Sequence, residues 1–311
     1  MANTPNDTAI DNQQPLVTIG VLSYNYSNYV IDALNSLLAQ TYSNIEIIII
    51  DDKSVENTPD LIDQWIKENN VSCMFIKNTE NIGITRVSNK IVGLSKGKYI
   101  SLFAIDDIML PRKIELQVKL LEEAGEEYGL CYANVEKMDE DGQPLGLYTP
   151  KNTFVAQEGY ILKPFITDGL SFATPGCLIR TSVYKKAGLY DERVLYEDYN
   201  FFLRVLALFK AKYCAYPCLV YRTRLTSPIH DTWTKNNRER YHRDRILSNL
   251  QALRFINDNE VKKILKKKNS QYLKSLSVYK SGYVKELIFT LLKNGYWNIP
   301  FRVWIRFITG K

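Results

Sequence analysis

Apolar runs and stretches with helical periodicity alternate along the first 125 residues of the chain. The runs have the length and continuity of buried strands: LVTIGVLS from Leu16, IEIIII at 45–50, CMFIK at 73–77 and KYISLFAI at 98–105. Apolar residues at 30, 33, 34, 37 and 38 recur at helical spacing, and further helices are expected from Thr58, over about 85–95, and from Pro111 to about 123. Thr58 is the expected N-cap of the second helix, with Pro59 at its first position.

Strands that are apolar throughout are typical of a parallel sheet whose two faces are both covered by helices. Ligands of such sheets bind beyond the carboxyl ends of the strands. Three of these ends carry polar residues: Ser23-Tyr24-Asn25, Asp51-Asp52 and Asp106-Asp107. We therefore predict an α/β, Rossmann-like fold with a mostly parallel central sheet flanked by helices, and a ligand site at these three ends.

The second half of the chain has a different organisation. From about residue 129 the pattern loosens, and GLCYANV with the Asp141-Gly142 turn predicts strands and a hairpin. Beyond about 234 the sequence is helical, basic and aromatic. We expect a disordered tail over 1–14, a main domain over 15–225 with parts at about 15–128 and 129–225, and a basic helical C-terminal region over 226–311.

Charge is distributed unevenly between these regions. The net charge is +6, but residues 1–209 carry −10 and residues 210–311 carry +16. Such an asymmetry predicts that the C-terminal third either meets an anionic partner or pairs with the acidic body. No nucleic-acid motif accompanies the basic residues, so no nucleic-acid partner is expected.

Several classes of protein are disfavoured by what the sequence lacks. The polar start MANTPNDTAIDNQQP is not a signal peptide, and no run of 18 apolar residues occurs, so a cytoplasmic location is expected. Five cysteines without a C-x-x-C pair are expected to be buried, reduced thiols, and two histidines exclude a His-rich zinc site. No dinucleotide-binding, P-loop or hydrolase-elbow motif is present.

Three segments resemble family 2 glycosyltransferases. The opening VTIGVLSYNYSNYVIDALNSLLAQTYSNIEIIIIDDKSVENT is similar to the family's strand, helix, strand and D-D-x-S pattern. NIGITRVSNKIVGLSKGKYISLFAIDDIMLP resembles the segment that ends in D-x-D-D, and TPGCLIRTSVYKKAGLYDERVLYEDYNFFLRVL resembles the late segment that ends in E-D-x-[DN]-x-x-x-R. The resemblance covers about residues 16–225 and implies the glycosyltransferase-A fold, with a nucleotide-sugar part first and an acceptor part second.

The resemblance also implies roles for individual residues. Asp51 is expected to contact the nucleobase, and Ser23, Tyr24 and Asn25 to hold the base and ribose, while Asp52 caps a turn. Asp106 and Asp107 are expected to bind Mg²⁺ or Mn²⁺, because carboxylates are hard oxygen ligands and the leaving diphosphate needs a cation. The alternative for this pair is an acidic cap of the helix at Pro111.

The acceptor side is implied in the same way. Asp198 matches the family's general base, with Glu197 beside it, although both also fit the start of a helix. Arg86 is expected either to reach the diphosphate or to lie on a helix surface. Asn89 and Gln40-Thr41 are expected to be structural.

Two positions depart from the family pattern. Ala104 replaces the first carboxylate of D-x-D-D. The R-x-H that often follows the last strand is Arg222-Thr223-Arg224 here, so either Arg224 contacts the diphosphate or His230 provides the metal ligand.

The resemblance implies an inverting glycosyltransferase that transfers a sugar from a nucleoside-diphosphate sugar, UDP being the expected nucleotide, to a glycan or lipid-linked acceptor of a bacterial surface polysaccharide. The segment YWNIPFRVWIRFITGK mixes aromatic and basic residues, which suits either peripheral contact with an anionic membrane or a helical cap on the core. One alternative is an inactive family member that acts as a sugar-binding or scaffold subunit. A nucleotidyltransferase would need a glycine-rich loop where SYNYSNY stands.

Overall fold

A computed structural model describes residues 14–149, 155–168, 170–223, 235–278 and 283–295, together with 299 and 303. Within these residues the chain forms the strands β1 (Val17–Ser23), β2 (Ile45–Asp51), β3 (Met74–Lys77), β4 (Tyr99–Ala104), β5 (Ile108–Met109), β6 (Tyr128–Ala133), β7 (Glu136–Met138), β8 (Pro144–Leu147), β9 (Leu178–Arg180), β10 (Lys210–Cys214) and β11 (Leu219–Arg222). The helices are α1 (Val30–Leu38), α2 (Thr58–Glu68), α3 (Ile84–Leu94), α4 (Lys113–Ala124), α5 (Leu162–Thr167), α6 (Thr181–Ala187), α7 (Glu197–Leu208), α8 (Lys235–Ala252), α9 (Asn259–Val278) and α10 (Tyr283–Lys293), with a 3₁₀ turn at Thr174–Gly176.

The described strands form two sheets. The larger has seven strands in the order β10-β6-β9-β4-β1-β2-β3, and the smaller has four in the order β5-β11-β7-β8. Neighbours in the larger sheet are parallel except where β9 runs antiparallel to β4 and β6. The sheet is therefore mixed but mostly parallel, which confirms the predicted α/β class.

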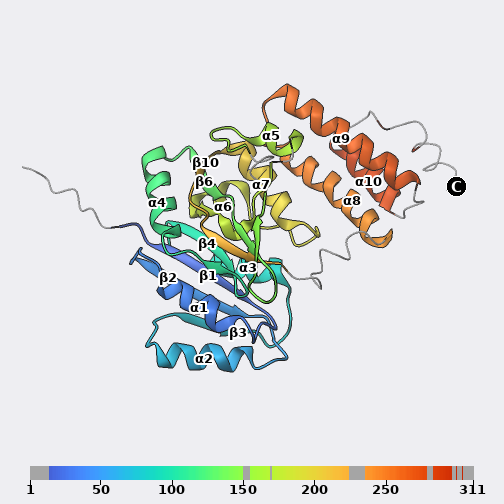
Figure 1. The fold of residues 1–311 in the computed structure, drawn as a ribbon. Helices are drawn as coiled ribbons and strands as arrows, with labels where there is room; N and C mark the ends of the chain where they lie inside the picture. The colour runs from blue at the N-terminus through green and yellow to red at the C-terminus, as the bar shows by residue number, and fades with distance from the viewer. Residues whose placement is uncertain are drawn as a thin grey trace, which may run out of the picture.

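Helices cover both faces of the large sheet, as the continuous apolar strands require (Figure 1). Ile47 and Ile49 of β2 belong to a core cluster that also contains Leu34 of α1 and Trp65 of α2. Their neighbours Ile48 and Ile50 point to the other face, into a cluster that includes Ile91 of α3. Successive side chains of a strand alternate between faces, so each of the buried positions from Ile47 to Ile50 needs an apolar residue.

Strand register brings three strand ends to one edge. Ser23 at the end of β1 pairs with Asp51 at the end of β2, and Leu22 pairs with Ala104 at the end of β4. The turn that follows β4 then leads directly into β5, which pairs with β11 in the smaller sheet. The predicted convergence of the three polar strand ends is thus confirmed.

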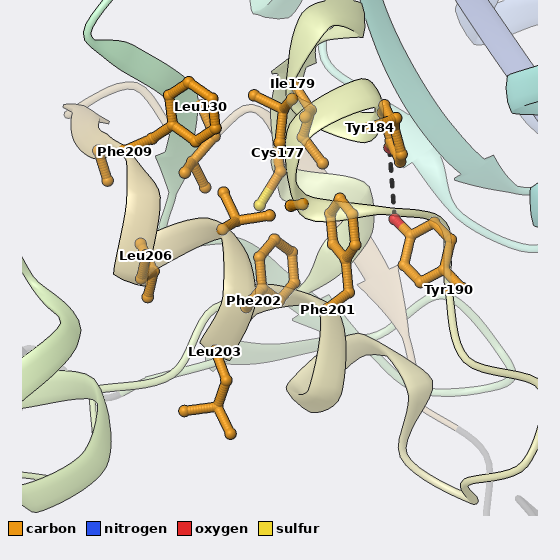
Figure 2. Close-up of a cluster of buried hydrophobic side chains, with 14 of the residues drawn as sticks. Leu130, Cys177, Ile179, Tyr184, Tyr190, Phe201, Phe202, Leu203, Leu206 and Phe209 are labelled. Atoms are coloured by element: carbon orange, nitrogen blue, oxygen red, sulfur yellow. Dashed lines mark hydrogen bonds between the residues drawn. The ribbon is translucent and has the colours of Figure 1, made fainter. Parts of the chain in front are cut away.

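Helix α7 is anchored by a large apolar cluster. Figure 2 shows its side chains Phe201, Phe202, Leu203 and Leu206 packed with residues of the sheet and of α6, while the hydroxyls of Tyr184 and Tyr190 lie 3.5 Å apart. Phe201, Leu203 and Val205 are fully buried. This packing fixes the direction of α7 and therefore the place of its first residues, Glu197 and Asp198.

The C-terminal helices pack together beside α5 and α7, far from α2 (Figure 1). They have a core of their own, which includes Leu250 of α8, Leu273 of α9 and Leu287 of α10. Ile299 and Val303 are buried in it as well. Val261 and Leu265 of α9 instead join the main core. The described part of this region therefore packs as a cap against the main domain, while Trp297 and Trp304 lie outside the described residues.

Two details of the predicted helices were wrong. The N-cap of α2 is Asn57, and the Thr58 hydroxyl instead accepts a hydrogen bond from the Tyr26 N–H, so it holds the loop after β1. Helix α4 begins at Lys113 rather than Pro111, with Arg112 as its N-cap, because β5 and a turn occupy the residues before it.

The five cysteines are free thiols, four of them buried. Among the described helices, none has the length and apolar character to cross a bilayer.

Candidate active site

Asp51 is the centre of a hydrogen-bonded clamp between the loops after β1 and β2. Its carboxylate accepts hydrogen bonds from Ser23 Oγ (2.9 Å), Ser54 N (2.9 Å) and Ser54 Oγ (2.6 Å). Asn25 adopts a left-handed conformation (φ 58°); its N–H donates to Ser54 Oγ, and its Oδ1 accepts from the Val55 N–H. Tyr24 is 42% exposed beside this clamp. The clamp holds these polar side chains in fixed positions at the strand ends, with the exposed ring of Tyr24 beside them.

Asp52 has a different function from its neighbour. Its carboxylate accepts hydrogen bonds from the backbone N–H groups of Ile82 and Gly83 and from Asn78 Nδ2, all within 2.9 Å. These groups lie in the loop that leads into α3, so Asp52 caps that turn, as expected. Asn89 and Gln40 are also structural: Asn89 bonds both backbone groups of Tyr190, and Gln40 donates to the carbonyls of Ser36 and Leu110.

Asp106 and Asp107 form the turn between β4 and β5. Both are buried, with 7% and 1% exposure, and Asp107 N–H bonds the Ala104 carbonyl. The Arg222 N–H donates to Asp107 Oδ1 (2.9 Å) and the Arg222 Nε–H to the Asp106 carbonyl (2.9 Å). A helix cap is not their function, because β5 separates the pair from α4.

Arg222 locks this turn to the smaller sheet. Its guanidinium also donates to the carbonyls of Asp139 and Glu140 and lies 4.2 Å from the centre of the Tyr29 ring. The first arginine of the R-x-R motif, Arg222, therefore stabilises the turn that carries Asp106 and Asp107. The sequence analysis singled out Arg224 and missed Arg222, although the Arg at the end of the last strand was a visible signal.

Two tyrosines link this turn to the predicted base. Burial, together with the charges of Asp107 and Asp106, raises the pKa of Tyr221. The Tyr221 ring packs edge-on against Tyr148, with centroids 5.9 Å apart. Tyr148 is 39% exposed, and the partial desolvation of its hydroxyl, together with the charge of Asp198, raises its pKa. Tyr221 therefore feels the charges of the paired carboxylates, and its neighbour Tyr148 feels that of Asp198.

Glu197 and Asp198 are half-buried at the first turn of α7. Burial and the neighbouring Asp198 raise the pKa of Glu197 to about 7. Burial also raises the pKa of Asp198, against the opposing effects of the Tyr199 N–H, which donates to Asp198 Oδ1 at 2.6 Å, and of the Arg245 guanidinium. A carboxylate with a raised pKa is a stronger proton acceptor than an ordinary aspartate.

Helix α8 holds the loop that leads to these carboxylates. Asp244 Oδ2 accepts a hydrogen bond from the Leu195 N–H (2.7 Å). Asn200 of α7 donates to Ser248 Oγ (3.1 Å) and Gln251 Oε1 (2.9 Å). The C-terminal region therefore supports the predicted base directly, which the sequence analysis did not anticipate.

The remaining candidate residues lie farther from this arrangement or outside the described part of the chain. Arg86 forms a salt bridge with Glu192 (2.9 Å) on the surface of α3, and its side chain is 60% exposed. Arg224 and His230 lie outside the described residues, so their roles stay predictions.

The donor set at the turn after β4 fits a hard divalent cation. Within the described ranges, no three His, Cys, Asp or Glu side chains converge to enclose a metal ion. Asp106 and Asp107 are adjacent, buried carboxylates, and Mg²⁺ is commonly held by one or two carboxylates together with phosphate oxygens of a substrate. A site completed by a diphosphate suits these two residues better than an all-protein cage.

Comparisons with known proteins agree with this geometry. The sequence profile described as Glycosyl transferase family 2 matches residues 18–188. An uncharacterised glycosyltransferase of Rickettsia typhi is 29% identical over 283 residues, which cover 87% of this chain and 82% of the relative. WfaP of Escherichia coli, a UDP-Glc:α-D-GlcNAc-diphosphoundecaprenol β-1,3-glucosyltransferase, is 31% identical over 198 residues, 62% of this chain and 70% of the relative.

A solved structure shows the same fold. Residues 1–349 of S. aureus TarS, in complex with UDP-GlcNAc, superpose with a TM-score of 0.62 at 15% identity, covering 95% of this chain and 92% of that one. Because the family profile spans more than half of the sequence, including the polar ends of β1, β2 and β4, the chain belongs to glycosyl transferase family 2 and is a glycosyltransferase.

Proposed function

We propose that this enzyme transfers a sugar, with inversion, from a UDP-sugar to a hydroxyl of a lipid-linked saccharide during synthesis of a bacterial surface polysaccharide. The observation that carries the proposal is the convergence of Asp51 and Asp106-Asp107 at one edge of the large sheet. The donor and acceptor in the name of WfaP, and the UDP-GlcNAc bound to TarS, support the choice of nucleotide and acceptor class.

On this proposal the donor lies across the ends of β1, β2 and β4. The clamp around Asp51 receives the base and ribose, with Ser23, Tyr24 and Asn25 at its rim. Asp106 and Asp107 would hold a divalent cation, Mg²⁺ or Mn²⁺, which would neutralise charge that develops on the leaving diphosphate. Arg222 keeps these carboxylates at the strand end through the Asp107 contact.

The acceptor hydroxyl lies against Asp198, which accepts its proton as the oxygen attacks the anomeric carbon. One displacement from the face opposite the diphosphate inverts the anomeric centre. The burial that raises the pKa of Asp198 makes its carboxylate more basic, and the Tyr199 N–H orients it. Glu197, with a pKa of about 7, is only partly ionised at neutral pH and so carries less than a full negative charge beside Asp198.

We propose further that the enzyme works at the cytoplasmic face of a membrane. The support is charge: residues 210–311 carry +16, and α9 alone exposes Lys263, Lys266 and Lys267 on its surface. Each basic residue near an anionic leaflet contributes about 1 kcal/mol, screened by salt.

The proposed metal site makes Asp107→Asn the informative substitution. The amide keeps an acceptor for the Arg222 N–H but removes the charge that would hold the cation. Titration calorimetry of UDP with Mn²⁺ should show affinity reduced at least about tenfold, or about 1.4 kcal/mol, and Asp106→Asn should be milder. Asp60→Asn, on the exposed surface of α2, is the control. Unchanged affinity in Asp107→Asn would overturn the metal assignment.

Asp198→Asn should separate chemistry from donor binding. The amide oxygen retains the bond from the Tyr199 N–H, but the proton acceptor is lost. Sugar transfer should fall by about 10²–10⁴, while UDP binding with Mn²⁺ stays within about twofold. Transfer that survives within a few-fold would move the base to Glu197, since Asp191 is already engaged with Arg193 and Gln251.

Glu197→Gln should stabilise the protein at neutral and alkaline pH. The pKa of Glu197 is raised to about 7, so the folded state keeps a proton that the unfolded chain loses above about pH 4.5. Stability contributed by this group therefore falls as pH rises from 4.5 through 7. Gln carries no such charge, so the gain should be on the order of 1–3 kcal/mol at pH 8 and close to zero at pH 4.5.

Chemical denaturation at pH 4.5 and pH 8 measures this difference. The control is Glu192→Gln in the segment before α7. The hydrogen bond from Arg86 lowers the pKa of Glu192, so this substitution should reduce rather than increase stability at pH 8. A Glu197→Gln variant that is no more stable than wild type at pH 8 would show that the carboxyl is not held in an unfavourable charged state.

Charge reversal on α9 tests the membrane proposal. Wild-type protein should float with vesicles that contain anionic lipid, and less as salt rises, because exposed charges are screened. The double variant Lys263→Glu/Lys267→Glu should float several-fold less, while Lys185→Glu on α6 should behave as wild type. Equal flotation of wild type and double variant would remove α9 from any membrane contact.

A further inference from the structure

One face of α8 is turned toward the predicted base. Arg238, Tyr241, His242 and Arg245 are spaced i, i+3, i+4 and i+7, so they share that face. The Arg245 guanidinium carbon lies 3.4 Å from the centre of the Tyr199 ring. It is also 4.8 Å from the Tyr241 ring centre and 5.6 Å from that of Tyr196. The guanidinium thus lies beside the residue that follows Asp198.

Aromatic rings line the space around this guanidinium. Tyr196 packs edge-on against Tyr241, with centroids 5.5 Å apart. Tyr272 of α9 continues the wall, 5.5 Å from the His242 ring and 6.2 Å from Tyr241. Tyrosine rings combine an apolar face with a polar hydroxyl, a combination suited to the alternating C–H and hydroxyl groups of a sugar.

Arg245 differs from the other arginines of α8 in its partners. Arg240 and Arg243 form salt bridges with Asp244, and Arg243 also with Glu286. Arg245 forms no salt bridge to any residue that the structure describes; its guanidinium hydrogen-bonds with the side chain of Tyr199, while its buried Nε has no hydrogen-bond acceptor among the described residues. A guanidinium stacked on a ring keeps its planar fork for an anion, and this fork matches phosphate oxygens.

We propose that the α8 face formed by Arg238, His242 and Arg245 binds a phosphate group of the acceptor. The inference rests on the proposed function: while Asp198 receives a ring hydroxyl of the acceptor saccharide, the phosphate on the anomeric carbon of that sugar reaches Arg245. The tyrosine wall then contacts the sugar ring. The C-terminal region is thereby part of the acceptor site, and the enzyme selects saccharides that carry an anomeric phosphate.

Binding without metal or donor tests this subsite separately from catalysis. The probe is N-acetylglucosaminyl diphosphate with a short alkyl chain, and its partner is the uncharged alkyl N-acetylglucosaminide of the same chain length. Calorimetry is done in EDTA, because two carboxylates without a cation repel a diphosphate and the donor site then contributes little. Wild-type protein should bind the diphosphate at least about tenfold more tightly than the glycoside, and less tightly as salt rises.

Variants then locate the contact. Arg245→Gln should lose at least about tenfold in affinity for the diphosphate and change little for the glycoside. Arg240→Gln makes the same change of charge on another face of α8 and should stay within about twofold of wild type. Equal affinities of wild type and Arg245→Gln for the diphosphate, with both folded by circular dichroism, would overturn the proposal.

Two further results need no variant. Equal affinity of the wild-type protein for the diphosphate and the glycoside would overturn the subsite even if Arg245→Gln failed to fold. Inorganic phosphate should compete only weakly, since the sugar contributes contacts; competition as strong as that of the diphosphate probe would overturn the assignment to the acceptor. If the wild-type protein binds the probes as expected but transfers no sugar to the diphosphate probe, the result counts against the proposed reaction and not against the subsite.

Discussion

The burial of both faces of β1, β2 and β4 is the constraint on which the rest of the structure depends. Because each of these strands is covered on two sides, it is apolar for most of its length, and a polar residue inside it, such as Thr18 or Ser101, needs a hydrogen-bond partner. The register of the three strands then brings Ser23, Asp51 and the turn at Asp106-Asp107 to the same edge. The place of the proposed donor site is a consequence of how the core is filled.

The same constraint explains why the carboxylates at this edge have different functions. Asp51 and Asp52 are adjacent in sequence, yet one closes a clamp around Ser23 and Ser54 while the other caps the turn before α3. Asp107 is held by the backbone of Arg222, which belongs to a strand of the smaller sheet. Hydrogen bonds to loops and to the second sheet therefore decide which carboxylates face a ligand.

Sequence periodicity was sufficient for the central sheet and the three polar strand ends, because these follow from local apolar patterns. It was insufficient where a contact joins distant segments. Thr58 has the residue type of a helix cap, but the Tyr26 N–H competes for its hydroxyl. Arg222 and Arg245 act through partners more than 40 residues away along the chain. Glu197 and Asp198 were found through the family pattern, whereas their support by α8 depends on tertiary packing alone.

Helix α8 packs against the other C-terminal helices on one side and holds the start of α7 on the other. Leu250 enters the core that α8 shares with α9 and α10, while Asp244 and Ser248 hold the segment that carries the base. On the proposed function, the residues that contact the donor lie between Ser23 and Asp107, whereas the proposed phosphate subsite of the acceptor lies on α8, a separate stretch of the gene. Descendants of such an enzyme can acquire a new acceptor through changes in the last quarter of the coding sequence while the nucleotide-binding half is inherited unaltered, and selection would then act on the two segments at different rates.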